Sequence, residues 1–329
     1  MAYVLGGGNG EELGFERAIA SFALRAVHES TGLVNMTTVV APTQGNVFEI
    51  PKFAPITYID YVPSATTGNV QGNADVQNPA LEQSSITASP AVATTAFDIF
   101  YGWTTSFNLA ATLGAELGDS FAEKVDQRVA KAFASFKATV GNTNYATSAD
   151  GFVRPSALGA MELIRDGATA ASPTPGFSAT TVLELVRNVK QNFKVARLPG
   201  VPVIVLDAGS TMNRLLAELT GGAVNNNISA LGNELLTSGA ISNVYGCRIE
   251  FTTFLSSAAR TVAGDSELVW VGAYFGDGAV YTVLKQGLDI KMGEQPGGLQ
   301  AWMTGVSYMG SGVGDSRRGG AINIAYAAD

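Results

Sequence analysis

The sequence predicts an α+β fold, and three observations support that prediction. Apolar residues recur at three- and four-residue steps over residues 119–140, which is typical of a long helix with one buried face. Residues 46–61 show partial alternation of apolar and polar side chains, which favours strands. From residue 176 onwards, helix-like and strand-like segments follow one another closely, and a chain of 329 residues has room for about two domains.

The first 45 residues are predicted to form an arm rather than a domain. A glycine-rich lead over residues 6–10 precedes a predicted helix over residues 11–30, in which Phe15, Ile19 and Phe22 share one face. A phosphate-binding role for the lead is not supported, because neither the Walker nor the Rossmann spacing follows it.

Residues 46–101 are predicted to form a long two-stranded ribbon. Pro51 and Pro55 restrict its first half to an edge strand or a bent strand, because proline donates no ladder hydrogen bond. Residues 63–80 are rich in turn-forming residues, and residues 83–115 contain a single charge, Asp98. Since an isolated two-stranded ribbon is only marginally stable, we expect something else to cover its apolar faces.

The clearest helix is predicted over residues 119–140. Ser120 and Glu123 form the Ser-x-x-Glu pattern of a capping box, and Gly141 marks the expected end. The residues expected on its buried face are Phe121, Val125, Val129, Ala132, Phe133 and Phe136. We interpret this helix as a structural spine with no chemistry of its own.

Residues 142–176 are predicted to be loops, and a compact α/β region follows them. Its first helix is capped by Ser178 or Thr181, and a second helix lies near residues 210–219. Cys247 is expected to be a small buried hydrophobic residue. Strands are predicted over residues 201–206, 244–251, 268–274, 280–290, 301–309 and 321–325.

The chain carries unusually little charge. Lys, Arg, Asp and Glu make up 15% of the residues, compared with about 25% in an ordinary soluble protein. Disorder does not explain the shortage, because 46% of the residues are apolar and the net charge is only −8. Interface cores are depleted in charge, so we expect partner chains to cover much of the surface. The acidic balance also argues against tight binding of nucleic acid through a basic face.

The sequence offers few residues for chemistry. It has one histidine, His28, and one cysteine, so a single chain cannot build the usual His/Cys zinc site or an internal disulfide. The serine-hydrolase, phosphate-loop and EF-hand motifs are absent, and Asp265, Glu267 and Asp277 are interpreted as solvated carboxylates. We therefore predict no catalytic residue, no cofactor and no metal. An α/β enzyme or small-ligand binding domain that uses only Asp, Lys and Tyr stays open as an alternative.

Two features bear on location. Residues 1–6 lack the basic start of a signal peptide, and no apolar run approaches the roughly 20 residues of a membrane span. We expect a chain that is made in the cytoplasm and has no membrane partner.

The order of these parts resembles the major capsid proteins of tailed bacteriophages, which have the Hong Kong 97 fold. The similar segments are a return strand followed by a spine helix, the strand and helix of the axial domain, a short turn with an apolar strand, and the closing strands. In this chain they are residues 97–117, 119–140, 203–207, 210–219, 239–249, 270–290 and 303–324.

The resemblance implies a domain plan. Residues 1–45 would be the N-terminal arm, and residues 46–101 the extended loop, a β-ribbon. Residues 102–175 and 286–329 would form the peripheral domain with its long spine helix, and residues 176–285 the axial α/β domain. The alternative left open is that the last strand belongs to the axial domain.

The resemblance also implies a function. The chain would assemble with many copies of itself, as pentamers and hexamers, into an icosahedral shell around double-stranded DNA that it contacts weakly and non-specifically. Scaffold, portal and decoration proteins would be further partners. It would be a virion component assembled in the host cytoplasm. The shell protein of an encapsulin nanocompartment, which has the same fold, is the nearest alternative.

In this family the extended loop lies on a neighbouring subunit. The resemblance therefore implies that residues of this loop contact neighbouring subunits. The residues expected to contact neighbours are Phe48, Ile50, Phe53, Ile56, Tyr58, Tyr61, Arg317 and Arg318. Some relatives join a lysine of this loop to an asparagine of a neighbour's peripheral domain. Lys52 lies in the loop, but residues 285–322 contain no asparagine, so we expect no such crosslink.

Overall fold

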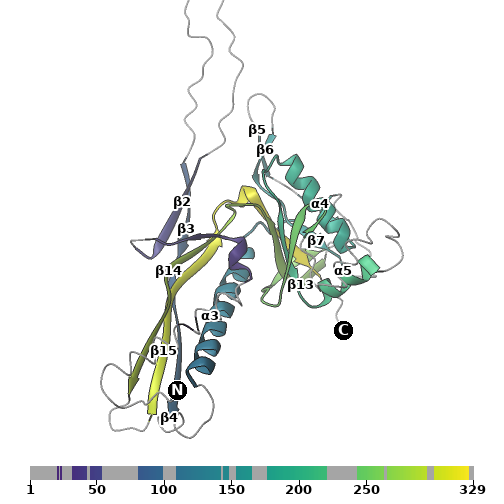
Figure 1. Ribbon diagram of the computed structural model, residues 1–329. Coiled ribbons are helices and arrows are strands. Elements are labelled where there is room, and N and C mark those ends of the chain that lie inside the picture. The colour runs from purple at the N-terminus through teal and green to yellow at the C-terminus, as the bar shows by residue number, and fades with distance from the viewer. Residues whose placement is uncertain are drawn as a thin grey trace, which may run out of the picture.

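The computed structural model contains an elongated sheet, a compact sheet and a long helix that packs against both (Figure 1). The residues it describes are 21, 23, 32–42, 45–53, 81–98, 109–141, 144–147, 153–164, 176–220, 243–262, 265–294 and 300–325. No helix among them is long and apolar enough to cross a membrane.

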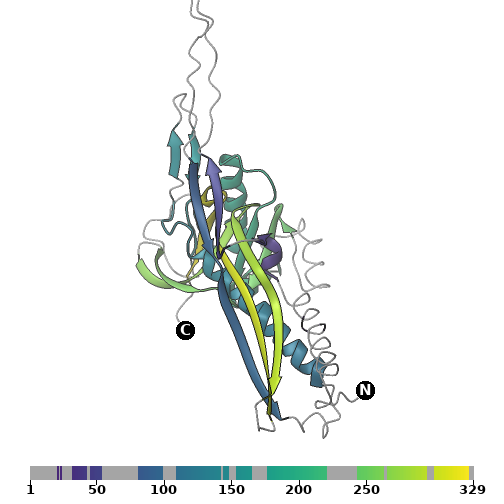
Figure 2. The same cartoon turned by 90° about the vertical axis from the view of Figure 1, so that its left-hand side faces the viewer.

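The elongated sheet, which we call the tongue, has four strands in the order β1-β14-β15-β4. Strands β4 (Ser89–Asp98), β15 (Gln300–Val313) and β14 (Val280–Glu294) are antiparallel neighbours, and the short strand β1 (Thr38–Val40) pairs with β14 in parallel. Helix α3 (Leu109–Phe133) lies along one face of the tongue (Figures 1 and 2).

The compact sheet, which we call the mixed sheet, combines parallel and antiparallel pairs in the order β10-β11-β9-β13-β16-β7-β8, with β12 attached to β13. Helices α4 (Val182–Val195) and α5 (Ser210–Thr220) pack on it and on each other. Its strands are β7 (Met161–Leu163), β8 (Ser178–Ala179), β9 (Val203–Asp207), β10 (Asn243–Val244), β11 (Cys247–Thr252), β12 (Ser257–Val262), β13 (Asp265–Phe275) and β16 (Gly319–Ile324).

Smaller elements complete the described chain. A two-stranded ribbon forms as predicted, because β2 (Val47–Phe53) pairs antiparallel with β3 (Leu81–Thr87). Its predicted extent to residue 101 is wrong, because residues 89–98 form β4 and pair with β15 in the tongue. Strands β5 (Asn144–Thr147) and β6 (Val153–Ala157) form a separate hairpin. Short 3-10 helices precede β1 and β16, and these are η1 (Val34–Met36) and η3 (Ser316–Arg318).

The predicted bounds of the spine helix are wrong, although its buried face is confirmed. Helix α3 begins at Leu109, so Ser120 lies exposed in its middle and caps nothing. Gly118, Asp119 and Ser120 have the composition of a helix start, but the buried Leu117 packs against Gly305 of the tongue, and this packing outweighs local propensity. The helix ends at Phe133 rather than near residue 140. Of the predicted face, Phe121 is half-buried, and the buried members are Val125, Val129, Ala132, Phe133 and Phe136.

In the structure Thr181 is the N-cap of helix α4, and the contribution of this cap to stability can be measured. Thr181 Oγ1 accepts a hydrogen bond of 3.1 Å from the amide of Glu184 at the start of α4. Thr181→Ala is expected to lower the free energy of unfolding by about 1 kcal/mol. Ser120→Ala should leave it unchanged or raise it by up to about 0.5 kcal/mol, because alanine is the better helix former. Equal losses for both variants in chemical denaturation would contradict this assignment.

Other differences from the sequence prediction are local. Residues 142–176, expected to be loops, contain β5, β6 and β7, and residues 109–117, expected in a return strand, are helical. Strand β12 was not predicted, because it forms by pairing with β13 rather than from an apolar pattern of its own. The segment 99–101 and most of the predicted helix over residues 11–30 lie outside the described residues, whereas Ser21 and Ala23 are helical.

The core runs from α3 into the mixed sheet. The rings of Phe133 on α3 and Phe275 on β13 lie 5.8 Å apart between centroids, and both are fully buried. Tyr274 is also buried, and its hydroxyl donates to the carbonyl of Gly159 at 2.6 Å. Cys247 is buried as predicted.

Asp126 of α3 binds the described end of the arm. Its Oδ2 accepts hydrogen bonds from the amides of Gly32 at 3.2 Å and Leu33 at 3.4 Å. Burial raises the pKa of the Asp126 carboxyl by more than these backbone hydrogen bonds lower it. The arm therefore meets the spine helix at a buried acid.

Candidate assembly interface

The base of the ribbon packs on its own chain. Ile50 is only 8% exposed and lies in a cluster with Ile86, Ala88 and Val283, against which the half-buried Phe48 also packs. Ile50 was expected to contact neighbouring subunits, but its side chain fills the core beneath the ribbon of its own chain. A contact of Ile50 with another subunit stays an untested prediction. Part of the Phe48 side chain packs against the same cluster.

Two glycines of β15 allow this close crossing. A Cβ atom at Gly310 would lie 2.4 Å from the backbone oxygen of Thr87, and one at Gly312 would lie 2.9 Å from Cγ1 of Ile86. Any side chain at either position would have to displace the ribbon. The ribbon base and the tongue are therefore one packed unit.

The other residues expected at the interface fall into two groups. The side chain of Phe53 and the whole of Ile56, Tyr58 and Tyr61 lie outside the described residues. Arg317 and Arg318 form ion pairs with Asp315 of the same chain, with shortest distances of 2.8 Å and 3.5 Å. Their role in assembly stays a prediction.

Lys52 is placed on the ribbon as expected. Its Nζ lies 3.7 Å from the Glu82 carboxylate on the facing strand, in an ion pair across the ribbon.

On the face of the tongue that points away from α3, the rows of β4 and β15 are largely exposed and uncharged before Asp98, whereas the row of β14 carries Asp289 and Lys291. Thr94 pairs with Thr304 across β4 and β15, and their hydroxyl oxygens lie 3.1 Å apart. Val92 on the same face is 63% exposed, and the indole of Trp302 is 39% exposed. Successive side chains of a strand point to opposite faces of the sheet. On this face β4 and β15 therefore present valine, threonine, alanine and tryptophan over much of their length.

Strand β4 forms one edge of this sheet. Among the described residues nothing pairs with its outer side, and residues 92–96 are all exposed. The strand spans ten residues and carries no charge before Asp98. A long, uncharged edge of this kind pairs readily with another chain, and proteins that remain monomeric usually protect such edges with charges, bulges or covering segments. The run without charges was visible in the sequence, but its place at a sheet edge was not.

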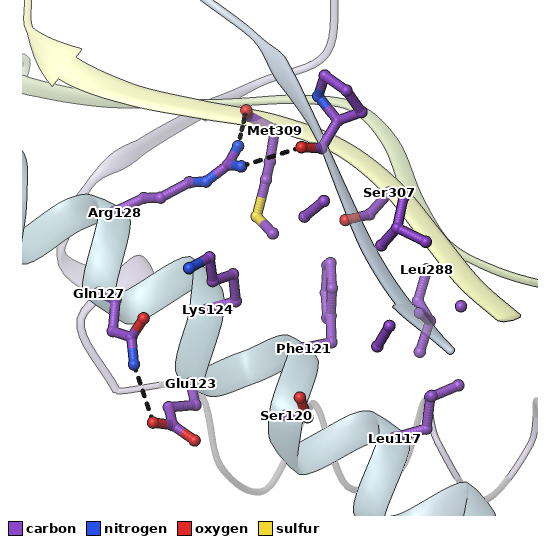
Figure 3. A pocket seen from close by; sticks show the side chains of 15 residues that line it. Leu117, Ser120, Phe121, Glu123, Lys124, Gln127, Arg128, Leu288, Ser307 and Met309 are labelled. Carbon is purple, nitrogen blue, oxygen red and sulfur yellow. Dashed lines mark hydrogen bonds between the residues drawn. The ribbon is translucent and has the colours of Figure 1, made fainter. Parts of the chain in front are cut away.

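A groove of about 350 Å³ lies between α3 and the β4 side of the tongue (Figure 3). Leu117, Phe121, Leu288 and Met309 line it with apolar surface, while polar side chains of α3 lie along the helix side. The groove opens beside the free edge, so the edge and the groove form one continuous surface.

Arg128 connects the helix to this edge. Its guanidinium donates to the carbonyls of Ser89 at 3.0 Å and Pro90 at 3.3 Å on β4, and to the carbonyl of Met309 on β15. Figure 3 shows the contact between Arg128 and Met309. Burial lowers the pKa of Arg128. A single side chain thus fixes where β4 begins relative to the spine.

The described residues hold little that could carry chemistry. They contain no group of three or more His, Cys, Asp or Glu side chains that could bind a metal ion. Burial raises the pKa of the Cys247 thiol to about 11, so this thiol is protonated at neutral pH and a poor nucleophile. His28 lies outside the described residues.

Comparison by sequence finds no relative: no family model and no curated protein matches. Solved structures do match over most of the chain. The capsid of the cyanophage P-SCSP1u is 19% identical with a TM-score of 0.62, covering 91% of this chain and 89% of that one. The mature capsid of bacteriophage PhiM1 is 15% identical with a TM-score of 0.58, covering 89% and 87%.

A virus-like particle from Pyrococcus furiosus also has this architecture. It is 10% identical with a TM-score of 0.55, and the match covers 94% of this chain and 99% of that chain. At these identities the likeness concerns the fold. The chain therefore has the Hong Kong 97-type fold of tailed-phage capsid proteins, as the order of its elements predicted.

Proposed function

We propose that this chain is the major capsid protein of a tailed bacteriophage, which assembles with many copies of itself into an icosahedral shell around double-stranded DNA. The observation that supports this most directly is the uncharged free edge of β4, with five consecutive exposed residues from Val92 to Ala96. A shell subunit needs such surfaces, and in a shell other subunits would cover them.

We assign the parts of the chain to the capsid plan by sheet. The tongue and α3 would be the peripheral domain, and the mixed sheet with α4 and α5 the axial domain at the centres of pentamers and hexamers. One fact favours a boundary other than that expected from the sequence: β14 continues as one strand from Val280 to Glu294, past position 285, although its pairing with β15 is irregular there. Strand β16 is part of the mixed sheet, which favours the axial domain for the last strand.

The further partners follow from this proposal. With a net charge of −8, the chain would contact packaged DNA weakly and without sequence preference. Scaffold, portal and decoration proteins would be further partners. The protein would be a virion component, assembled in the host cytoplasm without a catalytic role.

The encapsulin nanocompartment is the second candidate function. The match to the Pyrococcus furiosus virus-like particle, which covers 99% of that chain, supports a shell of this fold that is not a phage capsid. The two candidates differ in cargo, because one shell encloses DNA and the other encloses protein.

One experiment tests the proposal. The full chain, expressed alone and with its neighbouring genes, is examined by sedimentation velocity and negative-stain electron microscopy. Closed shells are the expected result, and nuclease-protected DNA in particles from the native source would separate the phage capsid from the nanocompartment. A chain that stays monomeric at micromolar concentration under both conditions would contradict a shell function and favour the enzyme or binding-domain alternative.

A further inference from the structure

The chain passes between the mixed sheet and the tongue at two neighbouring places. Residues 276–279 connect β13 to β14, and residues 314–318 connect β15 to β16. We call these segments the two crossings (Figure 1). The amide of Gly276 donates to the carbonyl of Arg318 at 2.9 Å, and the amide of Gly314 donates to the carbonyl of Ala279 at 2.8 Å. The crossings are therefore bound to each other along their backbones.

A single carboxylate organises the second crossing. Asp315 accepts from the amide of Arg317 at 3.1 Å, from its Nε at 2.8 Å and from its Nη2 at 3.0 Å. Arg318 Nε lies 3.5 Å from the other side of the same carboxylate, and Arg318 Nη1 donates to the carbonyl of Asp277 at 3.0 Å. Arg318 thus extends the Asp315 cluster to the first crossing.

The carboxylate at the centre of the cluster is largely removed from solvent, whereas Arg317 is half-buried and Arg318 is exposed. Asp315 is 8% exposed. Burial alone would raise the pKa of its carboxyl, but the hydrogen bonds and charges of Arg317 together with the charge of Arg318 outweigh this effect, and the pKa lies below its usual range. The carboxylate is therefore ionised, and the bidentate contact with Arg317 is a strong and geometrically specific kind of ion pair.

The ribbon is also coupled to this cluster. The pKa of Arg317 is raised, mainly by its hydrogen bond to Asp315, and the charge of Glu82 on β3 contributes in the same direction. Glu82 is the partner of Lys52 across the ribbon. The negative charge of Glu82 on the ribbon thus favours the charged form of Arg317.

We propose that Asp315, Arg317 and Arg318 form an ion-pair latch that sets the angle between the tongue and the mixed sheet. Packed sheets deform little, so a change in their relative orientation would be absorbed by the short segments between them. A latch at these segments selects one orientation, whereas crossings without it would allow several. The role of the latch in shells rests on the proposed function. A fixed angle between the tongue and the mixed sheet would give all subunits the same shape. Opening of the latch would accompany rearrangement of the shell.

The angle can be measured with spin labels. Cysteines are introduced at Thr95 on the tongue and Gln191 on α4, both of which are exposed. The native Cys247 does not compete for the label, because it is buried and its pKa is raised to about 11. Labelled chain is diluted with unlabelled chain, so that distances within one subunit are measured whether or not shells form. We expect one narrow distance distribution for the otherwise unchanged chain.

Asp315→Asn is the principal variant, because it removes the charge and keeps the size. It should broaden the distribution and add distances that the parent lacks. Asp277→Asn is the matched control in the first crossing: Arg318 uses only the backbone carbonyl of Asp277, and among the described residues its carboxylate forms no ion pair. The control should keep the narrow distribution. A narrow distribution for Asp315→Asn as well would overturn the latch.

A second variant keeps the test decisive if Asp315→Asn does not fold. Arg318→Gln removes only the weaker contact at 3.5 Å and the link to Asp277, and it should broaden the distribution to a smaller extent. An unchanged distribution in this variant would then count against the latch. Because the distances are measured within single subunits, their outcome is independent of shell formation. Failure of the proposed function would appear as absence of shells from the parent chain, and failure of the latch as unchanged distances.

Discussion

Replacing Phe133 with alanine is expected to lower the free energy of unfolding by about 3–5 kcal/mol, which is the usual cost of removing a fully buried phenylalanine. Phe133 lies at the end of α3, it is fully buried, and its ring meets that of Phe275 on β13 at 5.8 Å. The substitution would leave a cavity where the spine helix joins the mixed sheet. Chemical denaturation followed by circular dichroism measures the loss.

Phe121→Ala is the matched control, since it makes the same change in the same helix. Phe121 is half-buried beside the groove and packs less completely, so its loss should be well below that of Phe133. Equal and small losses for both variants would show that the end of α3 is not the buried junction described above.

Val92→Lys is expected to abolish closed shells while leaving the subunit folded. Val92 is 63% exposed on β4, so its replacement removes little packing, and the melting temperature and far-UV circular dichroism should stay unchanged. A lysine on an edge strand opposes pairing with another chain, because its charge would have to be desolvated in the contact. Sedimentation velocity and electron microscopy then report the loss of assembly.

The control at the same position is Val92→Thr, which keeps a β-branched side chain of similar size without adding charge. Threonine already occupies Thr94 on the same face, and shells should therefore form as in the parent chain. Normal shells from Val92→Lys would exclude the β4 edge as an assembly contact. Unfolding of this variant would show instead that the strand is needed by its own core.

Local sequence patterns predicted those parts of the fold that depend on one element. The apolar face of α3 followed from its helical spacing, because residues three and four apart lie on one side of a helix in any fold. A cap at Ser178 or Thr181 was predicted in the same way, and the structure selects Thr181, whose hydrogen bond to Glu184 joins residues three apart. The single charge within residues 83–115 also led to the expectation of a covered surface, and this stays a prediction.

The candidate interface could be predicted only in part. Ile50 was predicted to contact neighbouring subunits. The sequence pattern of an apolar residue on a ribbon is the same whether its side chain packs against its own chain or against another chain. The structure resolves this through Gly310 and Gly312, which are more than 200 positions away in the sequence and let the ribbon lie directly on β15. A local sequence pattern cannot show a contact between residues so far apart in the sequence.

The sequence by itself determined an α+β chain with little charge and a long amphipathic helix, since these properties belong to composition and to single elements. The capsid-type fold came from the resemblance of the order of its segments to a known family. Only the tertiary structure decided where α3 begins, which strand is left at a sheet edge, and which charges meet at Asp315. The physical reason is that strand pairing and burial are set by contacts between distant segments. Such contacts outweigh local propensities of about 1 kcal/mol or less per residue.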